Sequence, residues 1–123
     1  MIDHLGLRSN DVTATIAFLE KVLAPLGYSK QLFMAEHNVA SFGTSPHEAP
    51  LWVGPADQPS PVHLALTAKD RAAVDAFYEA AIAAGAKDHG KPGVRAHYHA
   101  NYYGAFVIDP DGNNLEAVCH TPA

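Results

Sequence analysis

An internal repeat is the feature of this chain that most constrains its fold. The segment that begins at residue 3 aligns with the segment that begins at residue 62 at an offset of 59 residues, so that His4 falls on His63 and Phe18 falls on Phe77. Both segments continue into a helical pattern that ends near a glycine. The repeat predicts two halves with the same order of strands and helices.

Each half carries one amphipathic helix after its first strand. Apolar residues recur at spacings of three and four, which indicates a helix with one buried face. The apolar positions are Ile16, Leu19, Val22, Leu23 and Leu26 in the first half and Val74, Phe77, Tyr78, Ala81 and Ile82 in the second. Asp70 is the expected N-cap of the second helix, Gly85 its expected end, and Pro25 with Gly27 the expected end of the first.

Three shorter strands are expected after each helix. They are predicted over 29–35, 39–43 and 51–54 in the first half and over 86–91, 102–109 and 114–120 in the second. The sequence therefore predicts an α+β fold of two pseudo-equivalent βαβββ modules that form a curled, cup-like mixed sheet. The 123 residues are expected to form a single domain, with module one over about 1–54, a Pro-rich linker over 55–61 and module two over about 62–123.

Charge and hydropathy exclude several kinds of partner. The net charge of −5 and the pI near 5.8 argue against binding to nucleic acid or to an anionic membrane. The apolar runs are too short to cross a bilayer, and the first residues lack the basic and apolar regions of a signal peptide. A single cysteine, Cys119, cannot form an internal disulfide. These features predict a cytoplasmic protein without a membrane or nucleic-acid partner.

A carboxylate within an apolar strand is the most unusual local feature. Glu116 follows Leu115 in the last predicted strand, and a buried carboxylate is costly unless a partner satisfies it. Strand alternation places Glu116, His4 and His63 on the faces turned away from the helices. Each of them alone is more often a solvated or paired polar residue. Together, two imidazoles and a carboxylate form a ligand set that leaves coordination positions open for water or substrate, so they predict a metal site.

Three stretches of the chain resemble the vicinal oxygen chelate superfamily. The stretches are "IDHLGL", "VHLAL" and "DPDGNNLEAV", and the last is the most specific. The superfamily includes glyoxalase I, extradiol dioxygenases, fosfomycin-resistance transferases and bleomycin-resistance proteins. The resemblance implies a homodimer, a divalent ion (Fe, Mn, Ni or Zn) held by His4, His63 and Glu116, and a small-molecule substrate that chelates the ion through adjacent oxygens.

One position departs from glyoxalase I, which uses two histidines and two glutamates. In the repeat, Trp52 stands where the second half has Glu116, and an indole cannot ligate a metal. The departure counts against lactoylglutathione lyase activity. Trp52 is expected to form an apolar wall of the pocket, with a plain core position as the alternative, and Asn114 shares the face of Glu116. Trp52 and Asn114 are the predicted substrate contacts.

A second cluster precedes the strand that leads into the Asp-Pro-Asp-Gly turn. It contains His97, His99, Tyr102 and Tyr103. Histidine titrates near neutral pH and tyrosine donates a hydrogen bond, so these residues are the candidates for acid–base catalysis. The alternative is a polar loop with aromatic packing. Strand parity separates Tyr102 from Tyr103 but does not say which of them faces the metal.

Three classes of function are compatible with these features. The first is a metal-dependent enzyme, most like the dioxygenase or transferase members of the superfamily and less like a true lactoylglutathione lyase. The second is a metal-free protein that sequesters a small molecule, as in the bleomycin-resistance group. The third is an inactive duplicate that binds a protein partner. The three ligand-type residues favour the first class.

Overall fold

Each half of the chain forms four strands and one long helix. The computed structural model describes residues 1–123. The first half contains β1 (Leu5–Ser9), α1 (Val12–Leu23), the short 3₁₀ helix η1 (Ala24–Leu26), β2 (Ser29–Met34), β3 (Val39–Gly43) and β4 (Leu51–Pro55). The second half contains β5 (His63–Thr67), α2 (Arg71–Ala83), β6 (Lys87–Val94), β7 (Tyr103–Ile108) and β8 (Asn114–Cys119). The predicted α+β class with two βαβββ modules is confirmed.

The two modules have the same sheet topology. The strand orders are β1-β4-β3-β2 and β5-β8-β7-β6, with the first and last strands of each module parallel and the other neighbours antiparallel. Gly6 pairs with Trp52 in the first sheet, and Ala65 pairs with Glu116 in the second. The sheets are unclosed, and β1 and β5 are edge strands. The structural repeat therefore matches the repeat in the sequence.

The helices begin and end where the local sequence predicts. The carboxylates of Asp11 and Asp70 accept hydrogen bonds from the backbone N–H groups of Ala14 and Ala73, which caps both N-termini. Gly27 and Gly85 have positive φ angles of 86° and 100°, a conformation that ends a helix at little cost for glycine. Pro25 lies in η1, so α1 ends just before it.

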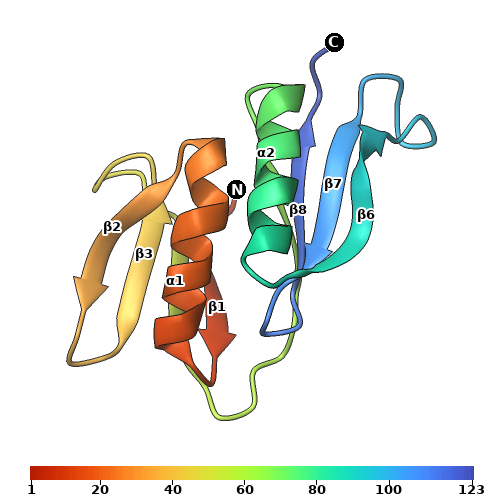
Figure 1. Cartoon of the computed structure of the whole chain (residues 1–123). Helices are drawn as coiled ribbons and strands as arrows, with labels where there is room; N and C mark the ends of the chain where they lie inside the picture. Colours follow the sequence, from red (N-terminus) through yellow and green to blue (C-terminus); the bar gives the residue numbers. More distant parts are fainter.

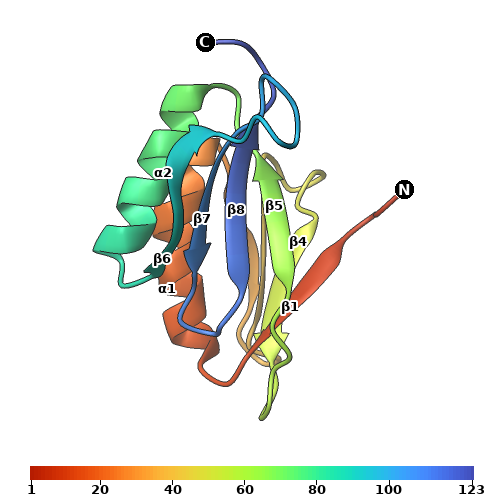
Figure 2. The ribbon, with the colours of Figure 1, turned by 90° about the vertical axis from the view of Figure 1, so that its right-hand side faces the viewer.

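The core lies between the helices and the sheets. Figure 1 shows the modules side by side with α1 and α2 adjacent, and Figure 2 shows both helices on one side of the sheets. Val22, Val74 and Phe77 are fully buried on the helix faces predicted from the spacing. Ile82, in contrast, is 39% exposed. The opposite faces of both sheets carry no helix.

Neither helix has the length or apolar character needed to cross a bilayer.

Strand β6 extends further than the sequence suggested. It continues through Pro92 to Val94, whereas the prediction ended the strand at residue 91. Proline cannot donate a hydrogen bond within a sheet, but β6 is an edge strand and pairs only with β7. Two register shifts near Gly90 and Gly93 interrupt that pairing. The edge position explains why the strand accepts the proline.

A polar cluster connects the two modules at the turn between β7 and β8. The Asp111 carboxylate accepts hydrogen bonds from the Ser9 hydroxyl at 2.9 Å and from the Thr15 hydroxyl at 2.6 Å. Ser9 and Thr15 lie at the end of β1 and in the first turn of α1, where both are buried. The negative charge at the N-terminal end of α1 is favourable as well. Asp111 therefore fixes one module against the other.

Replacing Asp111 by alanine should lower the free energy of unfolding by about 1–3 kcal/mol, because two buried hydroxyls lose their charged partner. Urea denaturation measures this change. Asp57→Ala is the matched control, because Asp57 is exposed and makes no side-chain hydrogen bond. Equal stabilities of the two variants would contradict the role of Asp111.

Candidate functional site

Glu116 is the buried centre of the candidate site. It lies in β8 between Leu115 and Ala117, and only 2% of its surface is exposed. The Tyr102 hydroxyl donates a hydrogen bond to Oε2, and the Nε2 atom of His63 lies 3.1 Å from Oε1. No lysine or arginine forms an ion pair with this carboxylate. Tyr102 and His63 are therefore the two side chains that contact the carboxylate oxygens.

The neighbouring backbone fixes the orientation of His63. Its Nδ1 atom lies 3.1 Å from the backbone carbonyl oxygen of Asn114. A carbonyl oxygen only accepts hydrogen bonds, so Nδ1 carries a proton and Nε2 is the ring atom that faces Glu116. Phe106 stacks on the imidazole, with ring centroids 6.2 Å apart and an interplanar angle of 22°. At this distance Nε2 and the carboxylate are joined either by a proton on the ring or by a metal ion between them.

The two donor atoms fit a divalent ion. Ligand atoms about 2.0–2.2 Å from one ion lie roughly 2.8–3.1 Å apart in octahedral geometry and roughly 3.3–3.6 Å apart in tetrahedral geometry. The separation of 3.1 Å between His63 Nε2 and Glu116 Oε1 agrees with the octahedral spacing. The hydrogen bond from His63 Nδ1 is also the kind that orients a ligating histidine. This pair therefore supplies two suitable ligands for an ion such as Fe, Mn, Ni or Zn.

Tyr102 is held against the carboxylate by the shape of the neighbouring strand. A Cβ atom at Gly104 would lie 3.2 Å from the Tyr102 ring and 3.4 Å from Oε2 of Glu116, so the glycine leaves room for both groups. Burial raises the pKa of the Tyr102 hydroxyl well above its usual value, and the hydrogen bond to Glu116 raises this pKa further. Tyr102 therefore keeps its proton and donates it to Glu116 in the hydrogen bond.

His4 lies on the other module. It precedes β1, in a segment that projects from the sheets on the side away from the helices (Figure 2), and 64% of its side chain is exposed. Its Nδ1 atom lies 2.6 Å from a carboxylate oxygen of Asp3, which leaves Nε2 free. Within one chain, no group of three or more His, Cys, Asp or Glu side chains is arranged so that it could hold a metal ion. A single chain thus joins His63 to Glu116 but does not bring His4 to them.

Trp52 lies beside His4 on the helix-free face of the first sheet. The two residues line a cavity of about 610 Å³ with Asp3, His47 and Glu48, and a second cavity of about 300 Å³ with Gly6, Arg8 and Gly54. Trp52 is partly exposed, as a cavity wall requires. Asn114 lies at the register position opposite His63, and its side-chain oxygen is buried without a hydrogen-bond partner.

The other predicted catalytic residues form their contacts with groups other than Glu116. Tyr103 points to the helix side, where its hydroxyl donates to Asp75 of α2 at 2.7 Å; this hydrogen bond raises its pKa. His99 lies against the Tyr102 ring and contacts His120, with Nε2 and Nδ1 2.8 Å apart. His97 packs on Tyr98. Tyr102 is therefore the one member of this cluster that bonds to Glu116.

Gly104 and Phe106 complete the surroundings of Glu116, although the sequence did not single them out. Phe106 pairs with Glu116 across β7 and β8, and Gly104 pairs with the neighbouring Val118. Both residues point to the same side of the strand as Tyr102, and this alternation is the sequence signal that could have identified them. The signal becomes useful only when the register of β7 against β8 is known.

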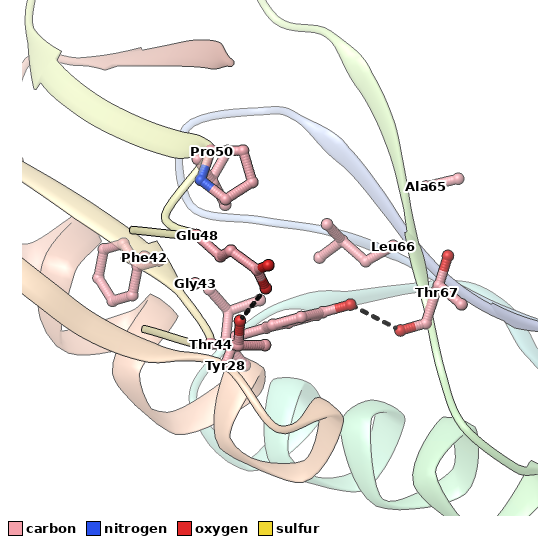
Figure 3. Close-up of a pocket in the computed structure, with 11 residues that line it drawn as sticks. Tyr28, Phe42, Gly43, Thr44, Glu48, Pro50, Ala65, Leu66 and Thr67 are labelled. Atoms are coloured by element: carbon pink, nitrogen blue, oxygen red, sulfur yellow. Dashed lines mark hydrogen bonds between the residues drawn. The ribbon is translucent and has the colours of Figure 1, made fainter. Parts of the chain in front are cut away.

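A separate cavity of about 340 Å³ lies between the modules (Figure 3). Phe42, Pro50 and Leu66 give it apolar walls. Two hydrogen bonds cross or border it, from the Tyr28 hydroxyl to the Thr67 carbonyl at 3.1 Å and from Thr44 to Glu48 at 3.0 Å. None of the predicted metal, catalytic or substrate-binding residues lines this cavity.

Comparisons with known proteins identify the family and the fold. Residues 1–117 match the family model described as the Glyoxalase/Bleomycin resistance protein/Dioxygenase superfamily. A glyoxalase/bleomycin resistance protein from Albidiferax ferrireducens T118 is similar in structure, with a TM-score of 0.80 and 25% sequence identity over 94% of this chain and 96% of that one. A search of curated proteins found no match.

Two further solved structures share the fold at lower identity. One is a glyoxalase/bleomycin resistance protein/dioxygenase family enzyme from Burkholderia phytofirmans PsJN, with a TM-score of 0.72 and 19% identity over 98% of both chains. The other is a variant of the fosfomycin resistance protein FosX from Listeria monocytogenes, complexed with Mn(II) and 1S,2S-dihydroxypropylphosphonic acid. Its TM-score is 0.72 at 17% identity, over 98% of this chain and 90% of that one.

Proposed function

The chain belongs to the Glyoxalase/Bleomycin resistance protein/Dioxygenase superfamily, and from this premise we propose that it is a metal-dependent enzyme acting on a small molecule. In this proposal His63 and Glu116 bind a divalent ion, and the substrate chelates that ion through two adjacent oxygens. The observation that carries the proposal is the pair of ligand-type atoms 3.1 Å apart, with the carboxylate buried and Nε2 of the imidazole directed at it.

The third ligand, His4, comes from a second copy of the chain in this proposal. Within one chain His4 does not join the His63–Glu116 pair. The edge strand β5 carries His63, and His4 directly precedes the edge strand β1, so both lie where another chain can approach. A two-fold symmetric homodimer would form two equivalent sites, each with His63 and Glu116 of one subunit and His4 of the partner subunit.

The residues around the ion have separate roles in this mechanism. A divalent ion held by His63 and Glu116 would supply positive charge able to polarise the oxygens of the substrate. Glu116 provides the balancing negative charge in a buried place, where electrostatic interactions are strong. The Tyr102 hydroxyl orients the carboxylate and keeps its own proton. Trp52 and Phe106 give the substrate apolar surfaces and exclude water.

The reaction type follows from what the first module lacks. At the register position equivalent to Glu116 it carries Trp52, so no second carboxylate stands at that position. This favours the chemistry of the dioxygenase or transferase members over that of lactoylglutathione lyase. The similar FosX structure holds Mn(II) with a 1,2-dihydroxy compound, which supports the proposal at the level of the fold.

Metal titration of the EDTA-treated protein tests the proposed function. Calorimetry with Mn(II), Fe(II), Ni(II) and Zn(II) should show one ion per chain for at least one metal, with a Kd below about 10 μM. The loaded protein should then bind catechol or a hydroxy-ketone more tightly than the stripped protein does. Failure of all four ions to bind at millimolar concentration would contradict the proposal.

Metal-free binding of a small molecule, without chemistry, is the second candidate function. The two cavities beside Trp52 favour it. A tryptophan wall next to open volumes of about 610 and 300 Å³ suits the capture of a flat apolar molecule. Equal affinity of the stripped and loaded proteins for the small-molecule probes would favour this candidate over the enzyme.

A further inference from the structure

Arg8 is an arginine without a protein partner on the helix-free face of the first sheet. The guanidinium of Arg95 donates to the carbonyls of Gly93 and Lys91, and that of Arg71 lies over the Tyr103 ring. Arg8 makes no side-chain hydrogen bond, and no carboxylate lies within ion-pair distance of it. Its donors are therefore free to bind something that the chain does not supply.

The position of Arg8 is set by the strand beside it. Arg8 pairs with Gly54 of β4, and a Cβ atom at Gly54 would lie only 3.0 Å from Nη1 of Arg8. The absence of that Cβ lets the guanidinium lie along the sheet. There it lines the cavity of about 300 Å³ that it shares with Trp52, and the lining contains no acidic residue.

The rest of this cavity suits a flat apolar group. Trp52 and Val39 supply apolar surface. Gly6 and Gly54 have no side chain to cover the backbone of β1 and β4. A Cβ atom at Gly6 would meet nothing within 4 Å, so the space above this residue is open. An aromatic ring has the shape to occupy it, and a planar guanidinium binds a carboxylate through two parallel hydrogen bonds.

We propose that Arg8, Trp52 and the two glycines form a carboxylate subsite, which takes a small molecule with a planar apolar body and one carboxylate group. The inference deepens the proposed function and rests on it for the chemistry at the metal. It identifies the substrate class as an aromatic or similarly flat carboxylic acid, whose acid group binds Arg8 while its adjacent oxygens bind the ion.

The subsite can be tested without any metal, because the chain has a single tryptophan and it lies in this cavity. Trp52 fluorescence of the EDTA-treated protein is titrated with benzoate, with the neutral analogue benzamide and with acetate. Benzoate should saturate the signal, and both benzamide and acetate should bind at least about 10-fold more weakly. Equal binding of benzamide would overturn the role of the guanidinium, and equal binding of acetate would overturn the role of the apolar walls.

Variants of the same protein separate the subsite from the fold. Arg8→Gln should weaken benzoate binding by more than about 10-fold, which is the loss expected for charged hydrogen bonds. Gly6→Val should weaken it as well, because the added side chain fills the open space. Lys69→Gln removes an equal charge from an exposed position and should leave binding unchanged. Unchanged affinity in Arg8→Gln would overturn the subsite, whereas failure of the metal titration alone would overturn only the metal chemistry.

Discussion

Replacing Glu116 by glutamine should reduce the affinity for the divalent ion by more than about 100-fold. Losses of 10–100-fold are typical when a group that only supports a ligand is changed, and Glu116 is itself the proposed charged ligand. The amide oxygen of glutamine can still accept the hydrogen bond from Tyr102, so the surroundings are preserved. Tyr102→Phe removes only that supporting bond and should cost about 10–100-fold.

Measuring the stability of Glu116→Gln shows whether a loss of metal affinity comes from the missing ligand or from unfolding. A buried carboxylate is costly to the metal-free protein, so Glu116→Gln should be at least as stable as the wild type in EDTA. Glu79→Gln removes a carboxylate from the exposed side of α2 and should bind metal like the wild type. Calorimetry measures the affinities, and urea denaturation measures the stabilities. Equal metal affinity in the wild type and Glu116→Gln would mean that Glu116 only pairs with a protonated His63.

Mixed dimers should recover the metal site that two different variants have each lost. His4→Ala and Glu116→Gln homodimers should both bind metal poorly, since each of their sites lacks one ligand. A dimer with one chain of each kind has one site with His4, His63 and Glu116 all present, because the ligands come from both subunits. Such a dimer, purified through two different affinity tags, should hold about half of the wild-type metal content.

This experiment separates the possible locations of the site. A site within one chain would stay damaged in every mixed dimer, because neither chain carries all three ligands, and no metal would return. A monomeric mass in light scattering would contradict the homodimer itself. His37→Ala is the matched control, since His37 is an exposed turn residue and its loss should not change the metal content.

Much of this arrangement could be predicted from the pattern of residues. Spacing of apolar residues predicted both helices, and strand alternation placed Glu116 and His63 on the same side of the second sheet. Parity also separated Tyr102 from Tyr103. Parity could not say which of the two tyrosines faces Glu116, because a strand has two faces. The contact that distinguishes them is the hydrogen bond between Tyr103 and Asp75 in α2, which places Tyr103 on the helix side.

The placement of the modules relative to each other was beyond such patterns. The position of His4 with respect to Glu116 depends on contacts between α1 and α2 and on the hydrogen bonds from Ser9 and Thr15 to Asp111, which join residues about a hundred positions apart. No local periodicity encodes these contacts. Arg8 was overlooked for a different reason: an arginine on a strand is usually solvated, and only its lack of partners distinguishes it.

The separation of His4 from the His63–Glu116 pair makes protein concentration a variable of metal binding. In the proposed dimer, one isolated chain offers the ion two ligands and the assembled pair offers it three. By mass action, an ion that prefers the three-ligand site also holds the subunits together, and dilution weakens both equilibria at once. The ion and the second subunit would thus act as mutual ligands, each raising the apparent affinity of the chain for the other.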